Sequence, residues 1–270
     1  MDQEARAEVV ASDGCRLRAR LAGRVDAPAL LLVHPIGFSG AFWDPVADLL
    51  APHFSLLIPD ARGHGGSARG AGETSIEQLA DDLLAIMDGR GVGAATVIGC
   101  SLGSATAMHF GAAHAERTTG LVLANAPARI PLPRERFDAM IAAARSGGYA
   151  ELARGMLTRW LAPGAAAARP DWFADQEAAI TRTDGDGFAD AFAALRDSDR
   201  GDDLARIHLP LLVVTGEYDQ AFDPAAAAAM ARGVSDGECS VIGCAGHLAP
   251  LEQPDEFAAR VHEFHDRRLG

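Results

Sequence analysis

Short, uninterrupted apolar runs recur along most of the chain. They are 29–33 (ALLLV), 54–58 (FSLLI), 95–99 (ATVIG), 120–124 (GLVLA), 210–216 (PLLVVTG) and 239–243 (CSVIG). Each run is too short for a typical helix, and its nearly continuous apolar character is typical of parallel strands that are covered on both faces. We therefore predict a mostly parallel central sheet.

Amphipathic segments separate these runs. The clearest spans 75–91, where Ile76, Leu79 and Leu83 fall on one helical face and the glycines 89 and 91 predict the end of the helix. Strands that alternate with helices favour an α/β architecture with helices on both faces of the sheet.

Two segments depart from the alternation. Residues 8–23 alternate polar and apolar positions around Ser-Asp-Gly, which predicts an antiparallel hairpin at one edge of the sheet. Residues 127–206 are rich in helix formers and hold no clear strand run, which predicts a helical cap inserted between strands. We expect the core to comprise 1–126 and 207–270, and the alternative is a separate helical domain.

Composition and charge narrow the class of protein. A chain of 270 residues fits one large domain with an insertion. The 24 Lys and Arg against 37 Asp and Glu give a net charge of −13, which disfavours nucleic acid and anionic membranes as partners. The first ten residues lack the pattern of a signal peptide, and no apolar run reaches the roughly 18 residues of a membrane helix. We expect a cytoplasmic protein.

The four cysteines are scattered along the chain. They form no CxxC pair, and no Cys/His cluster has the spacing of a zinc site. Without a secretory signal, free thiols are expected, and we predict no metal site.

The segment 96–105 (TVIGCSLGSA) carries the strongest chemical signal. Gly99, Ser101 and Gly103 form G-x-S-x-G between a predicted strand and a predicted helix, the context of a nucleophile elbow. A strained turn would lift the Ser101 hydroxyl above the sheet, beside the partial positive charge of a helix N-terminus. Cys100 would point away from the pocket and is interpreted as a small packed residue. The alternative for the serine is an ordinary helix N-cap.

A serine nucleophile needs a base and a carboxylate that orients the base. Asp219 follows the fifth apolar run and His247 follows the sixth, so both are expected at carboxyl ends of strands. The chain order Ser101, Asp219, His247 is that of the hydrolases built on a nucleophile elbow. Glu217 and Asp223 remain alternatives for the acid.

The oxyanion of an acyl-transfer reaction needs two hydrogen-bond donors. The backbone N–H of Leu102 directly follows the nucleophile. The loop after the run 29–33, with Gly37 and Gly40, would present the backbone N–H of Ile36 as the second donor. The alternative is that this loop is only a connecting turn.

These motifs together resemble the alpha/beta-hydrolase fold enzymes over nearly the whole chain. HPIGFSGAFW resembles the oxyanion loop, PDARGHGGS the D-x-R-G-x-G-x-S turn, GCSLGS the elbow, and GHLAPLEQPDEF the loop that carries the histidine. The resemblance implies the alpha/beta-hydrolase fold, a mostly parallel central sheet flanked by helices with a helical cap. It also implies that Asp60 and Arg62 hold loops near the site.

Within this family, the chain is similar to the 3-oxoadipate enol-lactonases. The similar stretches are FWDPVADLLAPHF, TRWLAPG and FAALRDSDRGDDLARIHLPLLVVTGEYD, and Pro35 stands where many hydrolases have glycine. The resemblance implies a serine hydrolase that acts on a small carboxylic ester or lactone. It suggests 3-oxoadipate enol-lactone as a candidate substrate. It implies an acyl-enzyme and no cofactor.

Substrate selection is assigned to the cap and the first loop. Trp160 is predicted to face the pocket, with Phe38 and Leu248 as apolar neighbours, and the alternative for Trp160 is packing between cap helices. An anionic substrate would need a cation, and the candidates in the cap are Arg134, Arg159 and Arg196.

Other functions remain open at this stage. The same triad could serve carbon–carbon bond hydrolysis, perhydrolysis or a lyase step, and a related chain could be a ligand receptor or a scaffold. The expected partner is a small-molecule ester or lactone, and the sequence carries no signature of oligomeric state.

Overall fold

The computed structural model describes residues 5–72 and 74–270. In these residues a single sheet has the strand order β1-β2-β4-β3-β5-β6-β7-β8. Its strands are β1 (Ala5–Val10), β2 (Arg16–Gly23), β3 (Ala29–Val33), β4 (Ser55–Pro59), β5 (Ala95–Cys100), β6 (Thr118–Ala124), β7 (Leu211–Gly216) and β8 (Gly237–Ile242). Strands β3 to β8 run parallel, whereas β2 is antiparallel to both of its neighbours. Each predicted run is a strand to within a few residues, and the predicted hairpin forms one edge.

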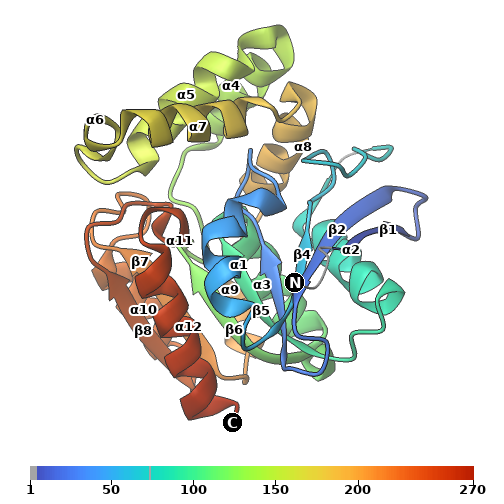
Figure 1. Ribbon diagram of the computed structural model, residues 1–270. Coiled ribbons are helices and arrows are strands. Elements are labelled where there is room, and N and C mark those ends of the chain that lie inside the picture. The colour runs from blue at the N-terminus through green and yellow to red at the C-terminus, as the bar shows by residue number, and fades with distance from the viewer. Residues whose placement is uncertain (1–4, 73) are drawn as a thin grey trace.

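Some helices flank this sheet, and others lie beyond it in the segment 127–206 (Figure 1). They are η1 (Gly40–Trp43), α1 (Asp44–Leu50), α2 (Ile76–Gly89), α3 (Leu102–Ala113), η2 (Ala115–Arg117), α4 (Arg134–Ala143), η3 (Ala144–Gly148), α5 (Tyr149–Trp160), α6 (Ala165–Ala168), α7 (Pro170–Thr181), α8 (Gly185–Arg196), α9 (Gly201–Arg206), α10 (Pro224–Arg232), α11 (Ala249–Glu252) and α12 (Pro254–Arg268). Every residue of β5 and of β7 is buried, as expected for strands covered on both faces. The predicted α/β architecture is therefore confirmed.

Helix α2 shows how local sequence sets an element. The Ser75 side chain caps it by accepting the backbone N–H of Gln78 at 3.1 Å. Ile76, Leu79 and Leu83 are buried on one face, as their spacing predicts. Among the described residues, none of the helices is long and apolar enough to cross a membrane.

Residues 127–206, all of them described, contain helices α4 to α9 and no strand. Helices α4 to α7 lie together on one side of the core, and α8 leads back from them toward the sheet (Figure 1). A Cβ on Gly187 of α8 would lie 2.2 Å from the carbonyl oxygen of Gly63, so α8 packs directly on the turn 60–67. The buried carboxylate of Asp190 in α8 also pairs with Arg69 of the core and Arg145 of η3.

Candidate active site

Ser101 lies in the sharp turn between β5 and α3. Its backbone has φ 53° and ψ −112°, a conformation that residues other than glycine rarely adopt. Its N–H donates to the carbonyl of Ala124 at 2.9 Å. A Cβ on Gly99 would lie 2.3 Å from the backbone of Gly103, and one on Gly103 would lie 2.1 Å from the carbonyl oxygen of Val33. The glycines of G-x-S-x-G are therefore required by close backbone packing.

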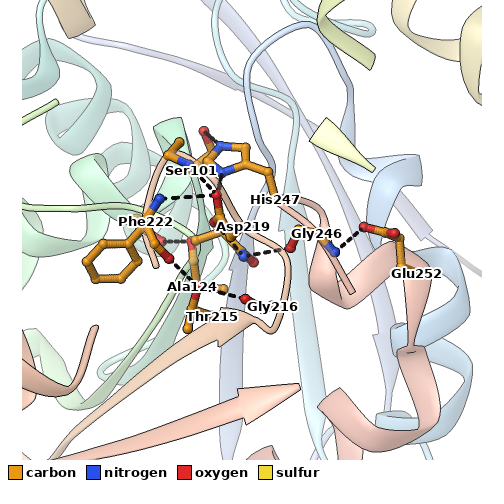
Figure 2. Close-up of polar contacts among 12 residues, drawn as sticks. Ser101, Ala124, Thr215, Gly216, Asp219, Phe222, Gly246, His247 and Glu252 are labelled. Carbon is orange, nitrogen blue, oxygen red and sulfur yellow. Dashed lines mark hydrogen bonds and ion pairs between the residues drawn. The ribbon is translucent and has the colours of Figure 1, made fainter. Parts of the chain in front are cut away.

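The three predicted triad residues meet at the carboxyl ends of their strands (Figure 2). His247 Nε2 is 3.1 Å from Ser101 Oγ, and His247 Nδ1 is 2.9 and 3.1 Å from the two carboxylate oxygens of Asp219. Asp219 also accepts the backbone N–H groups of Ala221 and Phe222. Burial alone would raise the pKa of Asp219. Hydrogen bonding and charge attraction by His247, together with hydrogen bonds from Asn125 and the Ala221 N–H, outweigh burial and hold that pKa below its ordinary value.

The alternative acids lie elsewhere. Asp223 caps α10 by accepting the N–H of Ala226 at 2.8 Å, and Glu217 accepts the N–H of Cys244 at 3.0 Å. Both side chains are exposed, and neither contacts His247. Of the three acids considered from the sequence, the structure brings Asp219 alone to the imidazole.

Cys100, the neighbour of Ser101, is fully buried and does not line the cavity described below. Burial raises the pKa of its thiol well above the ordinary value, and the charge of Asp219 adds to this effect. Because the thiolate is the nucleophilic form of cysteine, Cys100 is inert here and acts as a packed apolar residue.

Two backbone N–H groups lie close to Ser101. Leu102 is the first residue of α3, where helix N–H groups have no intrahelical partner, and Ile36 lines the same cavity as Ser101. Among the described residues, neither backbone N–H has a hydrogen-bond partner. Both predicted oxyanion donors are therefore free to bind a developing negative charge.

Two buried histidines hold the loop that presents Ile36. His34 Nε2 accepts the N–H of Ala61 at 2.9 Å, and His64 Nε2 accepts the N–H of Gly37 at 3.1 Å. Burial, aided by the nearby His34 ring, lowers the pKa of His64 to about 4, and burial also lowers the pKa of His34. Each ring is therefore neutral and can act as an acceptor. Sequence reasoning missed both, although each lies within a motif that carries the family resemblance.

The turn 59–67 connects several parts of this scaffold. Asp60 accepts the N–H of Gly40 at 2.7 Å and the N–H of Gly66 at 2.8 Å. Arg62 forms a two-pronged pair with Asp82 of α2, at 2.6 and 2.7 Å, and both side chains are buried. These contacts place Asp60 and Arg62 in loop-holding positions near the site, as the resemblance implied.

Glu252 connects the cap with the histidine loop. Its buried carboxylate accepts the N–H of Gly246 at 2.8 Å (Figure 2). It also accepts the N–H of Ala162 at 2.8 Å, and burial raises its pKa. The N–H of His247 donates to the carbonyl of Trp160 at 2.5 Å. The end of α5 is therefore joined to the backbone that carries the imidazole.

A cavity of about 690 Å³ lies over Ser101 and His247, between the core and the cap. Trp160 lines it, with its ring centroid 5.7 Å from that of His247. The other walls are mainly apolar and include Ile130, Leu132, Phe137, Met140, Leu152, Met156, Phe192 and Leu195. This size and character fit a small-molecule site.

Two residues predicted for the pocket lie outside the cavity. Phe38 is buried and packs against Phe42, with ring centroids 5.4 Å apart, because the positive-φ turn at Gly37 redirects the chain before it. Leu248 is fully buried just before α11. Both side chains belong to the core, and most of the apolar wall comes instead from the cap.

The structure also separates the cap arginines. Arg134 pairs with Asp197 at 2.7 Å, and Arg196 pairs with the same carboxylate. Arg159 lines the cavity, as does Arg136, which sequence reasoning missed. Within the described ranges, neither of these two has an ion-pair partner. Arg136 follows Arg134 by two positions in α4 and therefore faces a different side of that helix.

Comparison with known proteins gives the class of protein. The profile of the alpha/beta hydrolase family matches residues 30–260, and the chain belongs to this family.

Particular relatives share this length and shape. The 3-oxoadipate enol-lactonase 2 of Acinetobacter baylyi is 27% identical over 235 residues, which cover 87% of each chain. The crystal structure of the enol-lactonase from Burkholderia xenovorans LB400 is 30% identical, has a TM-score of 0.89, and covers 96% of this chain and 99% of its own. A thermophilic esterase from Thermogutta terrifontis is 27% identical with a TM-score of 0.91, covering 97% and 98%.

Proposed function

We propose that this protein is a serine hydrolase that cleaves a small carboxylic ester or lactone through an acyl-enzyme. The observation that carries the proposal is the hydrogen-bonded series Ser101–His247–Asp219 at the base of a cavity of about 690 Å³. A serine, an imidazole and a carboxylate in this arrangement are the parts needed for acyl transfer. The free N–H groups of Ile36 and Leu102 would stabilise the negative charge that develops on the substrate oxygen.

The reaction begins when Ser101 Oγ attacks the carbonyl carbon of the substrate and His247 Nε2 takes the hydroxyl proton. Asp219 keeps His247 Nδ1 as the donor and stabilises the imidazolium. The carbonyl oxygen becomes an oxyanion and accepts the N–H groups of Ile36 and Leu102. The carbon–oxygen ester bond then breaks, and His247 returns its proton to the leaving alkoxide.

Water completes the cycle. His247 takes a proton from a water molecule, whose oxygen attacks the acyl carbon. The second tetrahedral intermediate then expels Ser101 Oγ, and His247 returns the proton to this oxygen. The product is a carboxylic acid. With a lactone, the alcohol produced in the first half-reaction stays attached to the acyl group, so a single ring-opened hydroxy acid, or its keto tautomer if the alcohol is an enol, leaves the site.

The cavity favours a substrate with an apolar body and an anionic group. Apolar cap residues form most of its wall, and Arg136 and Arg159 are the cations placed on that wall. Relatives named 3-oxoadipate enol-lactonase make the enol-lactone of 3-oxoadipate the first specific candidate. A lactone formed through one carboxyl of an adipate leaves the other carboxylate free to pair with a guanidinium.

A screen of lactones and carboxylic esters tests this proposal, with Ser101→Ala as the matched control. The wild type should release acid and react with a fluorophosphonate at Ser101. The Ser101→Ala variant should fold normally and lose turnover by about 10⁴-fold or more. Full activity in Ser101→Ala would refute the mechanism. Peroxide-dependent halogenation without acid release would assign the triad to a different reaction.

A further inference from the structure

Asn125 is the only asparagine among the 270 residues, and it lies where the triad loops meet. It directly follows β6, the neighbour of β5 in the sheet, and its side chain is fully buried. Its amide Nδ2 donates to Asp219 Oδ2 at 3.0 Å and to the carbonyl oxygen of Gly246 at 3.1 Å. Gly246 immediately precedes His247, so one amide group bonds to both the acid loop and the histidine loop.

The backbone around Asn125 adds the third loop. Ser101 donates its N–H to the carbonyl of Ala124, the preceding residue, at 2.9 Å, and the N–H of Asn125 donates to Val214 of β7 at 2.9 Å. The position therefore connects the nucleophile turn, the strand that leads to Asp219, and the backbone that carries His247.

The two acceptors explain why an amide is present. Two N–H hydrogens on one nitrogen are needed to satisfy both Asp219 and the Gly246 carbonyl. An ionised carboxylate has no hydrogen to donate and would repel both acceptor oxygens. A hydroxyl would donate only one hydrogen. Among the described residues Asn125 Oδ1 has no hydrogen-bond partner, so the contacts of Nδ2 determine the orientation of the side chain.

The Gly246 peptide is fixed from the other side as well. Its N–H donates to Glu252 at 2.8 Å, and a Cβ on Gly246 would lie 2.3 Å from the carbonyl oxygen of Trp160. Asn125 thus restrains the carbonyl of a peptide whose N–H is already restrained. Such restraint fixes the direction in which the following imidazole leaves the backbone.

We propose that Asn125 is a positioning residue, whose neutral two-donor amide holds the carboxylate of Asp219 and the histidine loop in register for proton transfer from Ser101. The proposal rests on the function proposed for the triad. Its consequence is that the rate of the chemical step depends on the amide group of Asn125, and not only on the shape of the backbone there.

The backbone conformation at position 125 could by itself explain why an asparagine is present there. An experiment can distinguish this explanation from the positioning role. Asn125 has φ 56°, a region where asparagine is favoured over most residues, and glycine would satisfy it equally well. The Asn125→Gly variant keeps this backbone and removes the amide. Cys244 has φ 54° and an exposed side chain, so Cys244→Gly is the matched control for glycine at a positive φ.

The Asn125→Asp variant adds a test that a purely structural role would not pass. The titratable groups that face Asp219 are His247 and the buried thiol of Cys100, which stays protonated. A carboxyl at position 125 would lie beside Asp219 and take up a proton, because two adjacent carboxylates resist ionising together. While protonated, it can donate one hydrogen bond to Asp219. As the pH rises it ionises and repels that carboxylate.

The experiment measures kcat, the pH–rate profile and the rate of Ser101 labelling by a fluorophosphonate for the wild type and the three variants, after thermal unfolding has shown that each is folded. Asn125→Gly should lower kcat and the labelling rate by about tenfold to a hundredfold, the range for losing a hydrogen bond to a charged group. Asn125→Asp should gain a descending alkaline limb that the other proteins lack. Cys244→Gly should match the wild type.

The outcomes divide cleanly. Wild-type kcat and labelling in Asn125→Gly would overturn the proposal, and so would a pH–rate profile of Asn125→Asp with the shape of the wild-type profile. If Asn125→Asp does not fold, Asn125→Gly alone decides. Failure of the wild type itself to react with the fluorophosphonate would instead refute the function proposed for the triad.

Discussion

The floor and the roof of the cavity over Ser101 are built differently. The floor is made of the carboxyl ends of strands and the loops that follow them. There, Asp219 and both ring nitrogens of His247 have close polar partners. The roof is made of cap helices, whose apolar side chains are interrupted by Arg136 and Arg159. The hydrogen bonds at the floor position groups for chemistry, whereas the roof selects substrates by shape and charge. We expect substitutions at the floor to lower kcat and substitutions in the roof to raise KM.

Among changes at the floor of the cavity, substitution of Asp219 should have the largest effect on kcat. We expect Asp219→Asn to lower kcat by about 10⁴-fold with little change in folding, because the amide would favour the wrong tautomer of His247. Asp223→Asn, four residues along, should stay within a few-fold of the wild type, because Asp223 caps an exposed helix end. Steady-state kinetics measure both. Equal losses in the two variants would contradict the assignment of Asp219 as the acid.

The buried histidines that hold the loop of Ile36, at the floor of the cavity, should make the stability of the protein depend on pH. The pKa of His64 lies near 4 in the folded protein, against 6.5 ordinarily, because the ring is fully buried beside His34. Between pH 6.5 and pH 4 the unfolded chain therefore binds a proton at this site that the folded chain does not. Stability falls as the pH falls through this window, by about 3 kcal/mol from His64.

Urea unfolding at a series of pH values checks this prediction. The free energy of unfolding of His64→Gln should fall less between pH 6.5 and pH 4 than that of the wild type, because the glutamine amide can accept a hydrogen bond without titrating. His208→Gln, at an exposed position, is the matched control and should follow the wild type. Parallel curves for the wild type and His64→Gln would show that His64 is not held neutral.

The roof should respond in the opposite way. Arg159→Leu is expected to raise KM for a carboxylate-bearing lactone or ester by about tenfold, with kcat nearly unchanged, because a charge-assisted hydrogen bond to the substrate is lost. KM for a neutral ester of similar size should change little. Arg134→Leu is the control, since Arg134 already pairs with Asp197. A fall in kcat without a change in KM would show that Arg159 acts on the chemical step, as the floor residues do, and not on substrate binding.

The residues predicted for the triad lie together at the floor of the cavity, and the predicted Trp160 lines its roof, whereas other residues predicted for the pocket lie outside it. Ser101, Asp219 and His247 each follow an apolar run closely, and parallel strands bring such positions to one edge of a sheet regardless of the cap. Phe38 and Leu248 were predicted for the pocket, but the structure buries both in the core, while Arg136 lines the cavity. Loop turns and helix rotations set these directions, and neither follows from a local apolar pattern.

The supporting residues were the hardest to find. His34, His64 and Asn125 act on backbone groups or side chains that are 27 to 121 residues away in the chain. A signal was present in the single asparagine of the chain, which follows a buried strand in LANAP. Its partners were not predictable, because they depend on which strand ends lie next to β6.

By itself, the sequence determined the order of strands and helices along the chain, the G-x-S-x-G turn, and the positions of Asp219 and His247 directly after later strands. These features rest on short-range physics: apolar periodicity, the steric freedom of glycine at tight turns, and the rule that parallel strands share one carboxyl edge. Only the tertiary structure decided which arginines remain unpaired in the cavity, which aromatic side chains entered the core, and which buried polar groups hold the loops. Those outcomes depend on contacts between distant segments, where the cost of an unpartnered buried polar group determines the arrangement.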